Sequence, residues 1–297
     1  MRNLIIKKIF DAMSENKDMF FLTADMGINL VEPIQEKFPD RFLNVGIAEQ
    51  NLIGVSAGLA NLGYRPFAYS ISNFLIHRCY EQIRNDISLH DYPITLIGTS
   101  TGFDNAPLGP THHITDDWGN LKGFSNFQVF CPSSKTFAES MVSRVLEASK
   151  PTYIRIPKGN PLKPDSVADL VFFGSADARI VLITYGTLAQ ECLKAQELNP
   201  EISVIIINRI YPLDEQLLLE NLKLHKVVIS VEDHFPTAGL YSSICEVVVR
   251  NRLNIEVIAT GPTSAAFEVG GTADYYHQIF GLDSGSLIKQ IEKINGN

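Results

Sequence analysis

Short apolar runs rich in β-branched and aromatic residues alternate along the chain with segments whose apolar positions recur at helical spacing. This alternation predicts an α/β protein with mainly parallel sheets flanked by helices. The predicted strands are 20–25, 65–71, 93–100, 127–133, 152–157, 179–186, 202–210, 226–233 and 255–261. The predicted helices are 47–62, 74–90, 136–149, two segments ending near 198 and 224, 239–252 and 284–294.

The alternation is interrupted once, by a Pro-bearing stretch without clear periodicity around residues 159–170. Such a stretch is typical of a linker. We therefore expect two domains, each a mainly parallel sheet flanked by helices, at residues 1–160 and 176–297 with a linker at 161–175. A chain of 297 residues is long enough for both.

Composition narrows the class of protein. The net charge of −8 and the lack of a basic run argue against a nucleic-acid binder. No apolar stretch has the roughly 18 residues of a membrane span, and the N-terminus lacks the pattern of a signal peptide. The four cysteines lie far apart without a CxxC motif, which indicates reduced thiols in a cytoplasmic protein.

One short motif, GTSTG at 98–102, matches the nucleophile elbow of serine hydrolases around Ser100. The elbow requires a helix directly after the serine, whereas a loop with proline and glycine follows here. An ordinary strand end is therefore favoured, and a hydrolase using Ser100 stays as an alternative from another class. No GxGxxG follows the first strand, and GxxxxGK[ST] is absent from the sequence.

The loop at 102–119 carries His112, His113, Asp116 and Asp117 after the end of a predicted strand. Ligands of parallel α/β sheets bind outside such strand ends, and long irregular loops are usually functional. Adjacent histidines point in different directions and cannot easily share one ion, so we predict no metal site in this chain.

Glu49 poses a different question, because it begins an apolar predicted helix instead of lying on a polar face. The same helix contains Gly54 and Gly58, each of which costs about 1 kcal/mol there, so close packing or a ligand is expected nearby. A carboxyl in apolar surroundings can keep a proton or share one with a basic nitrogen of a ligand.

Taken together, these features resemble the second chain of a split, two-chain transketolase-like enzyme that depends on thiamine diphosphate. The resemblance covers a pyrimidine-binding domain at about 1–160 and a C-terminal domain at about 175–297. It is carried by LTADMG (22–27), VGIAEQN (45–51), GLANLGYRPFAYSI (58–71), YEQIRNDI (80–87), GPTHH (109–113), PSSKTFAE (132–139), YIRIPKG (153–159) and VEDHFPTAGLYS (231–242).

The resemblance implies roles at the cofactor. Glu49 matches the glutamate that hydrogen-bonds the aminopyrimidine and favours the tautomer that activates the thiazolium carbon. Asp25 matches an acid near the thiazolium. Phe74 is the candidate for the aromatic ring stacked on the aminopyrimidine, with Tyr80 as the fallback and a plain core position as the other reading of Phe74.

The resemblance also implies a substrate site. His112 matches a histidine at the substrate oxygen near the reacting carbon, and His113 follows it. Arg155 and Lys158 lie where relatives hold a sugar phosphate, with help expected from Arg78. Two positions depart from the pattern: Leu108 replaces an acid that reads a hydroxyl, and Ser100 replaces a phosphate-binding histidine. These changes suggest a less hydroxylated or differently tailed sugar.

The family's GDG…N motif, which holds the diphosphate and Mg²⁺, is missing from the sequence. The resemblance therefore implies a separate partner subunit with that motif and a heterotetramer. The expected activity is transfer of a two-carbon ketol unit between sugars or sugar phosphates. The alternatives are a deoxyxylulose-phosphate synthase-like subunit, a 2-oxo acid dehydrogenase beta-type subunit, and a non-catalytic assembly subunit.

Overall fold

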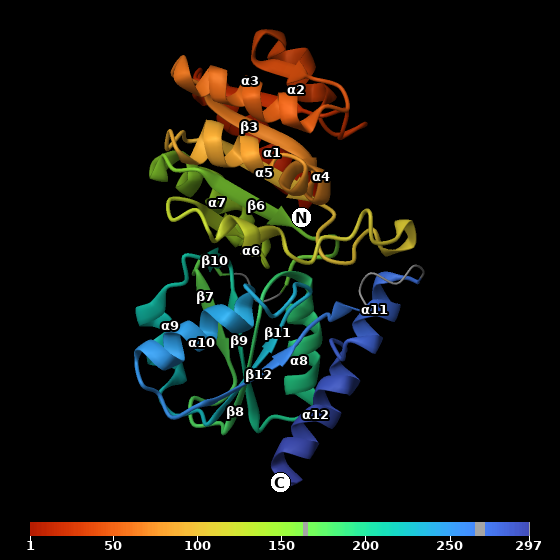
Figure 1. Cartoon of the computed structure of the whole chain (residues 1–297), viewed down its shortest axis with the longest axis vertical. Coiled ribbons are helices and arrows are strands. Elements are labelled where there is room, and N and C mark those ends of the chain that lie inside the picture. Colours follow the sequence, from red (N-terminus) through yellow and green to blue (C-terminus); the bar gives the residue numbers. More distant parts are fainter. Residues whose placement is uncertain (163–165, 265–270, 297) are drawn as a thin grey trace.

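The computed structural model describes residues 1–162, 166–264 and 271–296, and it places two α/β domains one above the other along the long axis (Figure 1). The first domain is built on a sheet of order β10-β5-β6-β4-β3-β1-β2. Its own strands are parallel: β1 (Met19–Thr23), β2 (Phe42–Asn44), β3 (Arg65–Ile71), β4 (Thr95–Thr99), β5 (Gln128–Phe130) and β6 (Thr152–Ile156).

Helices cover both faces of this sheet, which is why its central strands are apolar along their length. Alternate side chains divide between two cores: Phe21 and Phe67 pack under α1 (Arg2–Glu15) and α7 (Lys135–Ala148). Their neighbours Leu22 and Ala68 pack on the opposite side, under α3 and α4. The helices of that side are α3 (Glu49–Asn61), α4 (Ser72–His77), α5 (Tyr80–Gln82) and η2 (Ile83–Ser88).

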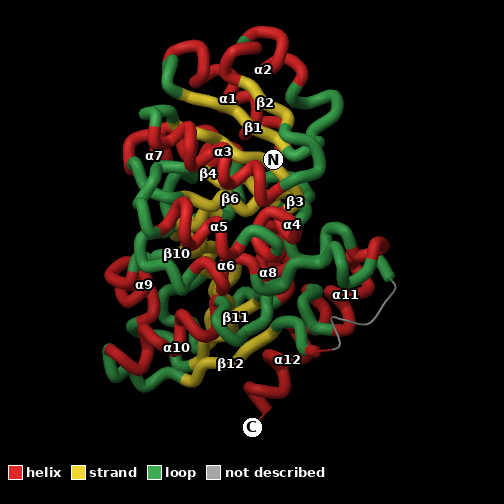
Figure 2. The backbone as a smooth tube through the Cα atoms, turned by 45° about the horizontal axis from the view of Figure 1, so that its top comes forward, coloured by secondary structure: helices red, strands yellow, loops and turns green. Residues whose placement is uncertain are grey.

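The second domain has a sheet of order β12-β11-β8-β9-β7, with β7 antiparallel to β9. Figure 2 shows the strands of both domains running through the middle of the molecule between helices. The strands are β7 (Leu170–Phe173), β8 (Ile180–Thr184), β9 (Ile202–Ile207), β11 (Val227–Val231) and β12 (Glu256–Thr260). The helices are η4 (Gly186–Leu188), α8 (Ala189–Leu198), α9 (Glu215–Leu222), α10 (Leu240–Arg250), α11 (Ala273–Ile279) and α12 (Ser284–Gly296).

The fold class is confirmed, but several elements differ from the sequence prediction, and β2 (Phe42–Asn44), α6 (Asp117–Leu121) and α11 (Ala273–Ile279) were not predicted. The predicted strand 202–210 is two strands, because β10 (Arg209–Tyr211) leaves the second sheet and pairs antiparallel with β5 of the first. The predicted helix 74–90 is interrupted after α4. Strand β7 lies inside the predicted linker, part of which, 163–165, falls outside the described residues.

The strand exchange fastens the two domains together. Asn208, buried between β9 and β10, accepts hydrogen bonds from the backbone N–H and the hydroxyl of Ser133 (2.9 and 2.6 Å) and donates to Ala168 O (2.9 Å). One apolar core runs across this junction from Val129 to Ile210 and Tyr185. The loops at the carboxyl ends of the first sheet are therefore held against the second domain.

Candidate active site

Glu49 occupies the first turn of α3, directly after β2, and its side chain is only 2% exposed. One carboxylate oxygen accepts a hydrogen bond from Ser70 Oγ of β3 at 3.2 Å. The other oxygen pairs with the Arg78 guanidinium at 2.9 Å. A helix N-terminus favours a negative charge at this position. The start of α3 therefore stabilises the buried carboxylate of Glu49.

Arg78 and Phe74 extend the site outward from Glu49. The Arg78 guanidinium lies over the Phe74 ring at 4.4 Å from the centroid. His112 lies on another side of Phe74, and the two rings meet edge-on with their centroids 5.2 Å apart. The interruption after α4 makes this possible, since it leaves Arg78 at a helix end, where Gln50 donates to its carbonyl (2.8 Å). Glu49, Arg78, Phe74 and His112 therefore form one continuous cluster.

The loop bearing His112 is fastened to α4 along its length. Asn73 Nδ2 donates to the carbonyl of Thr111, and Thr111 Oγ1 lies 3.0 Å from His112 Nδ1. Further on, His77 Nε2 pairs with Asp116 Oδ1 at 2.7 Å, and this hydrogen bond raises the pKa of His77. These contacts fix the histidine that the sequence predicts to meet substrate.

Asp25 lies at the end of β1, on the same sheet edge as the turn that leads into Glu49. Its side chain is exposed, and its backbone is left-handed (φ 54°). Asn44 at the end of β2 bonds both its backbone N–H (3.0 Å) and its carboxylate (3.2 Å). Asp25 is therefore a fixed acid at the rim of this edge, and its place near a cofactor stays a prediction.

Lys158 lies just beyond β6, where it lines a pocket of about 400 Å³ with Thr99, Gly159 and the N-terminal residues Met1, Arg2 and Asn3. Two cationic side chains, Lys158 and Arg2, thus share one cavity, and both are exposed. Arg2 was not predicted from the sequence, because nothing local to an N-terminal arginine indicates that β4 and β6 end beside it. Ser100 directly follows Thr99, the β4 residue that lines this pocket.

The structure corrects the prediction for Arg155. Its side chain is 1% exposed and forms ion pairs with Asp117 (2.9 Å) and Asp233 (3.0 Å). Because both partners are carboxylates inside the domain junction, the guanidinium has neither the exposure nor the free charge to hold a substrate phosphate. Arg155 joins the two domains, and we remove it from the proposed substrate site.

The remaining predicted site residues, Tyr80, His113 and Leu108, lie outside this cluster. The Tyr80 ring stacks on Phe124 at 5.1 Å, so it packs toward the α6 (Asp117–Leu121) side and not beside Phe74. His113 is buried edge-on against Phe103 and Tyr276, and this contact packs the loop against α11. Leu108, in η3 (Ala106–Leu108), is 59% exposed on the part of the loop that projects beside α11 (Figure 1).

The geometry at Ser100 does not support a nucleophile elbow. Its backbone is left-handed (φ 61°) at the end of β4, as in an elbow, and its side chain is buried. However, the next residues form turns and then η3, so no helix begins behind the serine. The serine hydrolase hypothesis is not supported.

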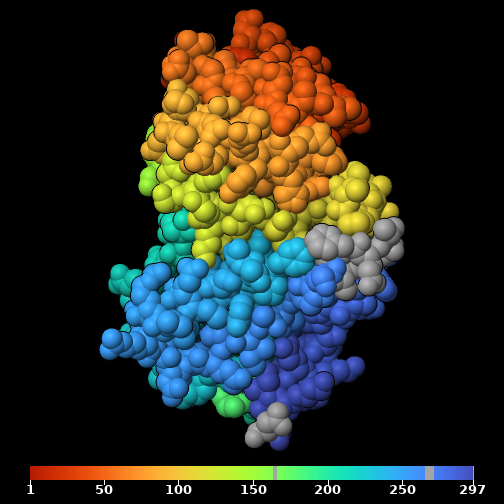
Figure 3. Space-filling view, viewed as in Figure 1, coloured from red at the N-terminus to blue at the C-terminus, as the bar shows by residue number. Residues whose placement is uncertain are grey.

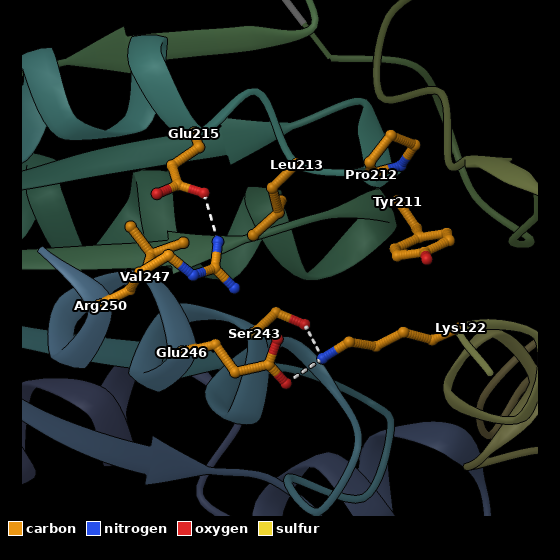
Figure 4. Close-up of a pocket in the computed structure, with 9 residues that line it drawn as sticks. All are labelled: Lys122, Tyr211, Pro212, Leu213, Glu215, Ser243, Glu246, Val247 and Arg250. Carbon is orange, nitrogen blue, oxygen red and sulfur yellow. Dashed lines mark hydrogen bonds and ion pairs between the residues drawn. The ribbon is translucent and has the colours of Figure 1, made fainter. Parts of the chain in front are cut away.

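A second pocket, of about 260 Å³, lies between Lys122 of the first domain and residues of α9 and α10 of the second (Figure 4). Its charged residues neutralise one another: Lys122 pairs with Glu246, and Arg250 pairs with Glu215. None of the predicted site residues lines it. Within the described residues, we find no cluster of three metal-ligating side chains and no helix long and apolar enough to cross a membrane.

A buried glutamate joined through an arginine to an aromatic ring, at the carboxyl edge of one α/β domain that packs on another, defines an α/β protein with a candidate ligand site at its strand ends. Comparison with known families agrees: residues 1–163 match the transketolase pyrimidine-binding domain and residues 174–284 the transketolase C-terminal domain. The chain therefore belongs to the transketolase family.

Individual relatives show which members of the family this chain resembles. The chain is 30% identical to one of the subunits of the apulose-4-phosphate transketolase of Actinobacillus succinogenes, over 99% of this chain and 98% of that one. It is 29% identical to the 1-deoxy-D-xylulose-5-phosphate synthase of Rhodopirellula baltica, but spans only 40% of that enzyme. A solved split-gene transketolase, an inactive beta4 tetramer, superposes with a TM-score of 0.86 at 26% identity, covering 98% of this chain and 97% of its own.

Proposed function

We propose that this chain is the pyrimidine-binding and C-terminal subunit of a two-chain, thiamine diphosphate-dependent transketolase. In this proposal it transfers a two-carbon ketol unit between sugar phosphates once it is joined to a second subunit. The observation that carries the proposal is the cluster of Glu49, Arg78, Phe74 and His112 on one exposed edge of a transketolase-family domain.

The donor set of this cluster fits an aminopyrimidine. Glu49 offers a buried carboxylate whose second oxygen pairs, among the described residues, with Arg78, a side chain that is 44% exposed. Phe74 offers an aromatic face that the Arg78 guanidinium covers at 4.4 Å from the centroid. Bound thiamine diphosphate supplies the carbon nucleophile. Glu49 would hold the proton shared with the ring nitrogen, Phe74 would orient the ring, and Asp25 would face the thiazolium side.

The substrate would lie between His112 and the pocket of Lys158 and Arg2. His112, held by its contacts with Phe74 and Thr111, would exchange a proton with an oxygen near the reacting carbon. The two cations of the pocket suit a phosphate at the far end of the sugar. Leu108 offers no hydrogen bond to a hydroxyl, which favours a less hydroxylated substrate than ordinary pentose phosphates.

The partner proposal rests on surfaces left open in this chain. Ile28 and Ile47, which flank Asp25 and Glu49 in the sequence, are 80% and 76% exposed. The predicted close packing at Gly54 and Gly58 is not made within the described residues: both face solvent, and a Cβ at either would meet nothing within 4 Å. We infer that a second subunit covers this edge, supplies the GDG…N motif with the diphosphate and Mg²⁺, and completes a heterotetramer.

The deoxyxylulose-phosphate synthase alternative is favoured by the likeness to that enzyme. The two activities differ in donor: the synthase condenses a 2-oxo acid with release of carbon dioxide, whereas a transketolase transfers a ketol unit from a sugar. Supplying the assembled enzyme with each donor and measuring carbon dioxide separates them. Release of carbon dioxide from a 2-oxo acid, without ketol transfer, would replace our proposal.

The experiment that tests the proposal is co-purification of this chain from its source cells, followed by activity measurements with a Glu49→Gln variant. We expect a partner with a GDG…N segment, and loss of turnover in Glu49→Gln without loss of assembly. Glu147→Gln, an exposed helix position, is the matched control and should keep full activity. Near-normal turnover in Glu49→Gln would contradict the proposed mechanism.

His112→Ala provides an independent check on the substrate role. The variant should lower turnover by about 10²- to 10⁴-fold, the range of a lost general acid or base, while cofactor affinity stays close to that of the wild type. Weakened cofactor binding with unchanged turnover would assign His112 to the cofactor instead.

A further inference from the structure

Asp104 lies in the loop between β4 and η3, and its carboxylate joins two strand ends. One carboxylate oxygen accepts hydrogen bonds from the backbone N–H of Thr101 (3.0 Å) and from the backbone N–H of Lys158 (2.7 Å). Thr101 follows β4 and Lys158 follows β6, and these strands are neighbours in the first sheet. The Asp104 side chain thus fixes the backbone after both strands that end at the pocket of Lys158 and Arg2.

The side chain of Lys158 is held by the same loop. Its ammonium donates to the carbonyl of Asp104 and to Asn105 Oδ1, both at 2.9 Å. An ammonium has three donors, so these two contacts leave one for a ligand. Because the side chain is exposed at the pocket that it shares with Arg2, Lys158 is presented to that pocket in a fixed position. In Figure 3 the loop at 102–119, which holds Lys158, is yellow and projects at the edge of the molecular surface.

The charges around Asp104 come from three elements. Arg155 of β6, Lys158 beyond it and Asp233 after β11 all act on its carboxylate, and Arg155 is itself shared with Asp117. Burial, with the like charge of Asp233, raises the pKa of Asp104 to about 7. The strength of its two backbone hydrogen bonds therefore changes near neutral pH, since an ionised acceptor forms the stronger bond.

We propose, resting on the function proposed above, that Asp104 is a positioning residue for anion binding, which fixes Lys158 in the orientation that receives the substrate phosphate. The ionised carboxylate holds the Lys158 backbone, and the loop carbonyl next to it holds the ammonium. When the carboxylate is neutral, the loop and the strand end separate more easily and Lys158 loses its fixed position. Phosphate affinity then falls with pH while the chemistry at Glu49 and His112 is unchanged.

The first measurement uses the full chain alone, with inorganic phosphate as the probe, followed by NMR. In Asp104→Asn, which keeps the shape and loses the charge, we expect phosphate to bind roughly three- to tenfold more weakly at about pH 8, as loss of a charge-assisted bond predicts. Asp177→Asn, an exposed aspartate of the second domain, is the matched control and should bind like the wild type. Equal affinity in Asp104→Asn and the wild type overturns the proposal.

Amide hydrogen exchange of the same chains measures directly how firmly the Asp104 carboxylate holds the backbone N–H groups of Thr101 and Lys158. The wild type should lose protection at Thr101 and Lys158 between about pH 8 and about pH 6, after correction for intrinsic rates. Asp104→Asn should show low protection at both values, with the rest of the chain unaffected. Unchanged protection in this variant overturns the proposal, whether or not the chain proves to be a transketolase subunit.

In the assembled enzyme, the effect should appear in KM and not in kcat. For a phosphorylated donor, the wild-type KM should rise about three- to tenfold as pH falls from about 8 to about 6. Asp104→Asn should show the high KM throughout; the ionisation of the substrate phosphate affects both enzymes alike. A fall in kcat without a change in KM overturns the positioning role. Lack of ketol transfer in the wild-type complex would refute the proposed function instead, leaving the phosphate and exchange measurements to judge Asp104.

Discussion

Two of the arginine–carboxylate pairs have the same N–O distance and a buried carboxylate, but differ in the exposure of the arginine. Arg78 meets Glu49 at 2.9 Å, and Arg155 meets Asp117 at 2.9 Å. Both carboxylates are buried. The arginine of the first pair is 44% exposed at the domain edge, whereas the arginine of the second is 1% exposed inside the domain junction.

The difference lies in what replaces water around each charge. Inside the junction, Arg155 has a second carboxylate in Asp233, and Asp117 has the Tyr153 hydroxyl at 2.8 Å. Such compensation is what a buried ion pair requires. At the edge, the Arg78 side chain is exposed to solvent, and the proposed cofactor would compete with it for Glu49. The sealed pair is structural, whereas the half-open pair is accessible from the edge of the domain, as the proposed cofactor site requires.

The largest effect on stability is expected when the sealed pair is broken. Arg155→Ala leaves two buried carboxylates without a counter-charge, and we expect the free energy of unfolding to fall by about 3–5 kcal/mol. Urea denaturation of the full chain measures this loss. A loss no greater than that of Arg78→Ala would remove the distinction between the two pairs.

The next effect is a pH dependence that belongs to the same junction. Glu232 accepts hydrogen bonds from the backbone N–H groups of Leu240 (2.7 Å) and Tyr241 (2.8 Å), and burial raises its pKa to about 8. Its folded pKa lies above the unfolded one, so folding takes up a proton between about pH 4.3 and about pH 8. Its contribution to stability is therefore present at the acid end of this window and is lost as pH rises.

Each linked proton changes the free energy of unfolding by about 1.4 kcal/mol per pH unit. Glu232→Gln should remove one such proton, so its stability should fall less steeply than that of the wild type between about pH 5 and about pH 8. Urea titrations at several pH values measure both slopes. Parallel slopes would show that Glu232 does not take up this proton.

Breaking the half-open pair should cost less stability than breaking the sealed pair. Arg78→Ala leaves one buried carboxylate that keeps its hydrogen bond from Ser70, and we expect the free energy of unfolding to fall by about 1–3 kcal/mol. The same variant should alter thiamine diphosphate affinity in the assembled enzyme, because it changes the partner of Glu49. Unchanged affinity would separate Arg78 from the cofactor site.

The smallest effect tests the two aromatic candidates. Tyr80→Phe removes one long hydrogen bond, to Asn120 O at 3.4 Å, and should change stability by no more than about 0.5 kcal/mol with normal cofactor affinity. Phe74→Ala should weaken cofactor binding far more. If Tyr80→Phe were the variant that lost cofactor affinity, the stacking role would pass to Tyr80.

Much of this arrangement could be read from the sequence, because it depends on local patterns. The alternation of apolar strands and helices predicts the two α/β domains, and the apolar neighbours of Glu49 predict its burial. The split of β9 from β10 was not predictable, because residues 202–210 are mostly apolar and nothing local to Asn208 marks a change of sheet. Only the tertiary contacts of Asn208 reveal where the chain changes sheets.

The sequence alone determined the fold class, the family resemblance and the identity of the acid at the start of α3, since periodicity and local chemistry are enough for these. Tertiary structure decided which charges are free to act. Arg155 and Lys158 are three residues apart in YIRIPKG, yet one is sealed between two aspartates and the other faces a pocket with Arg2. Burial and counter-charge come from chain segments distant in sequence. They decide whether a basic side chain is available to a ligand or joins two domains.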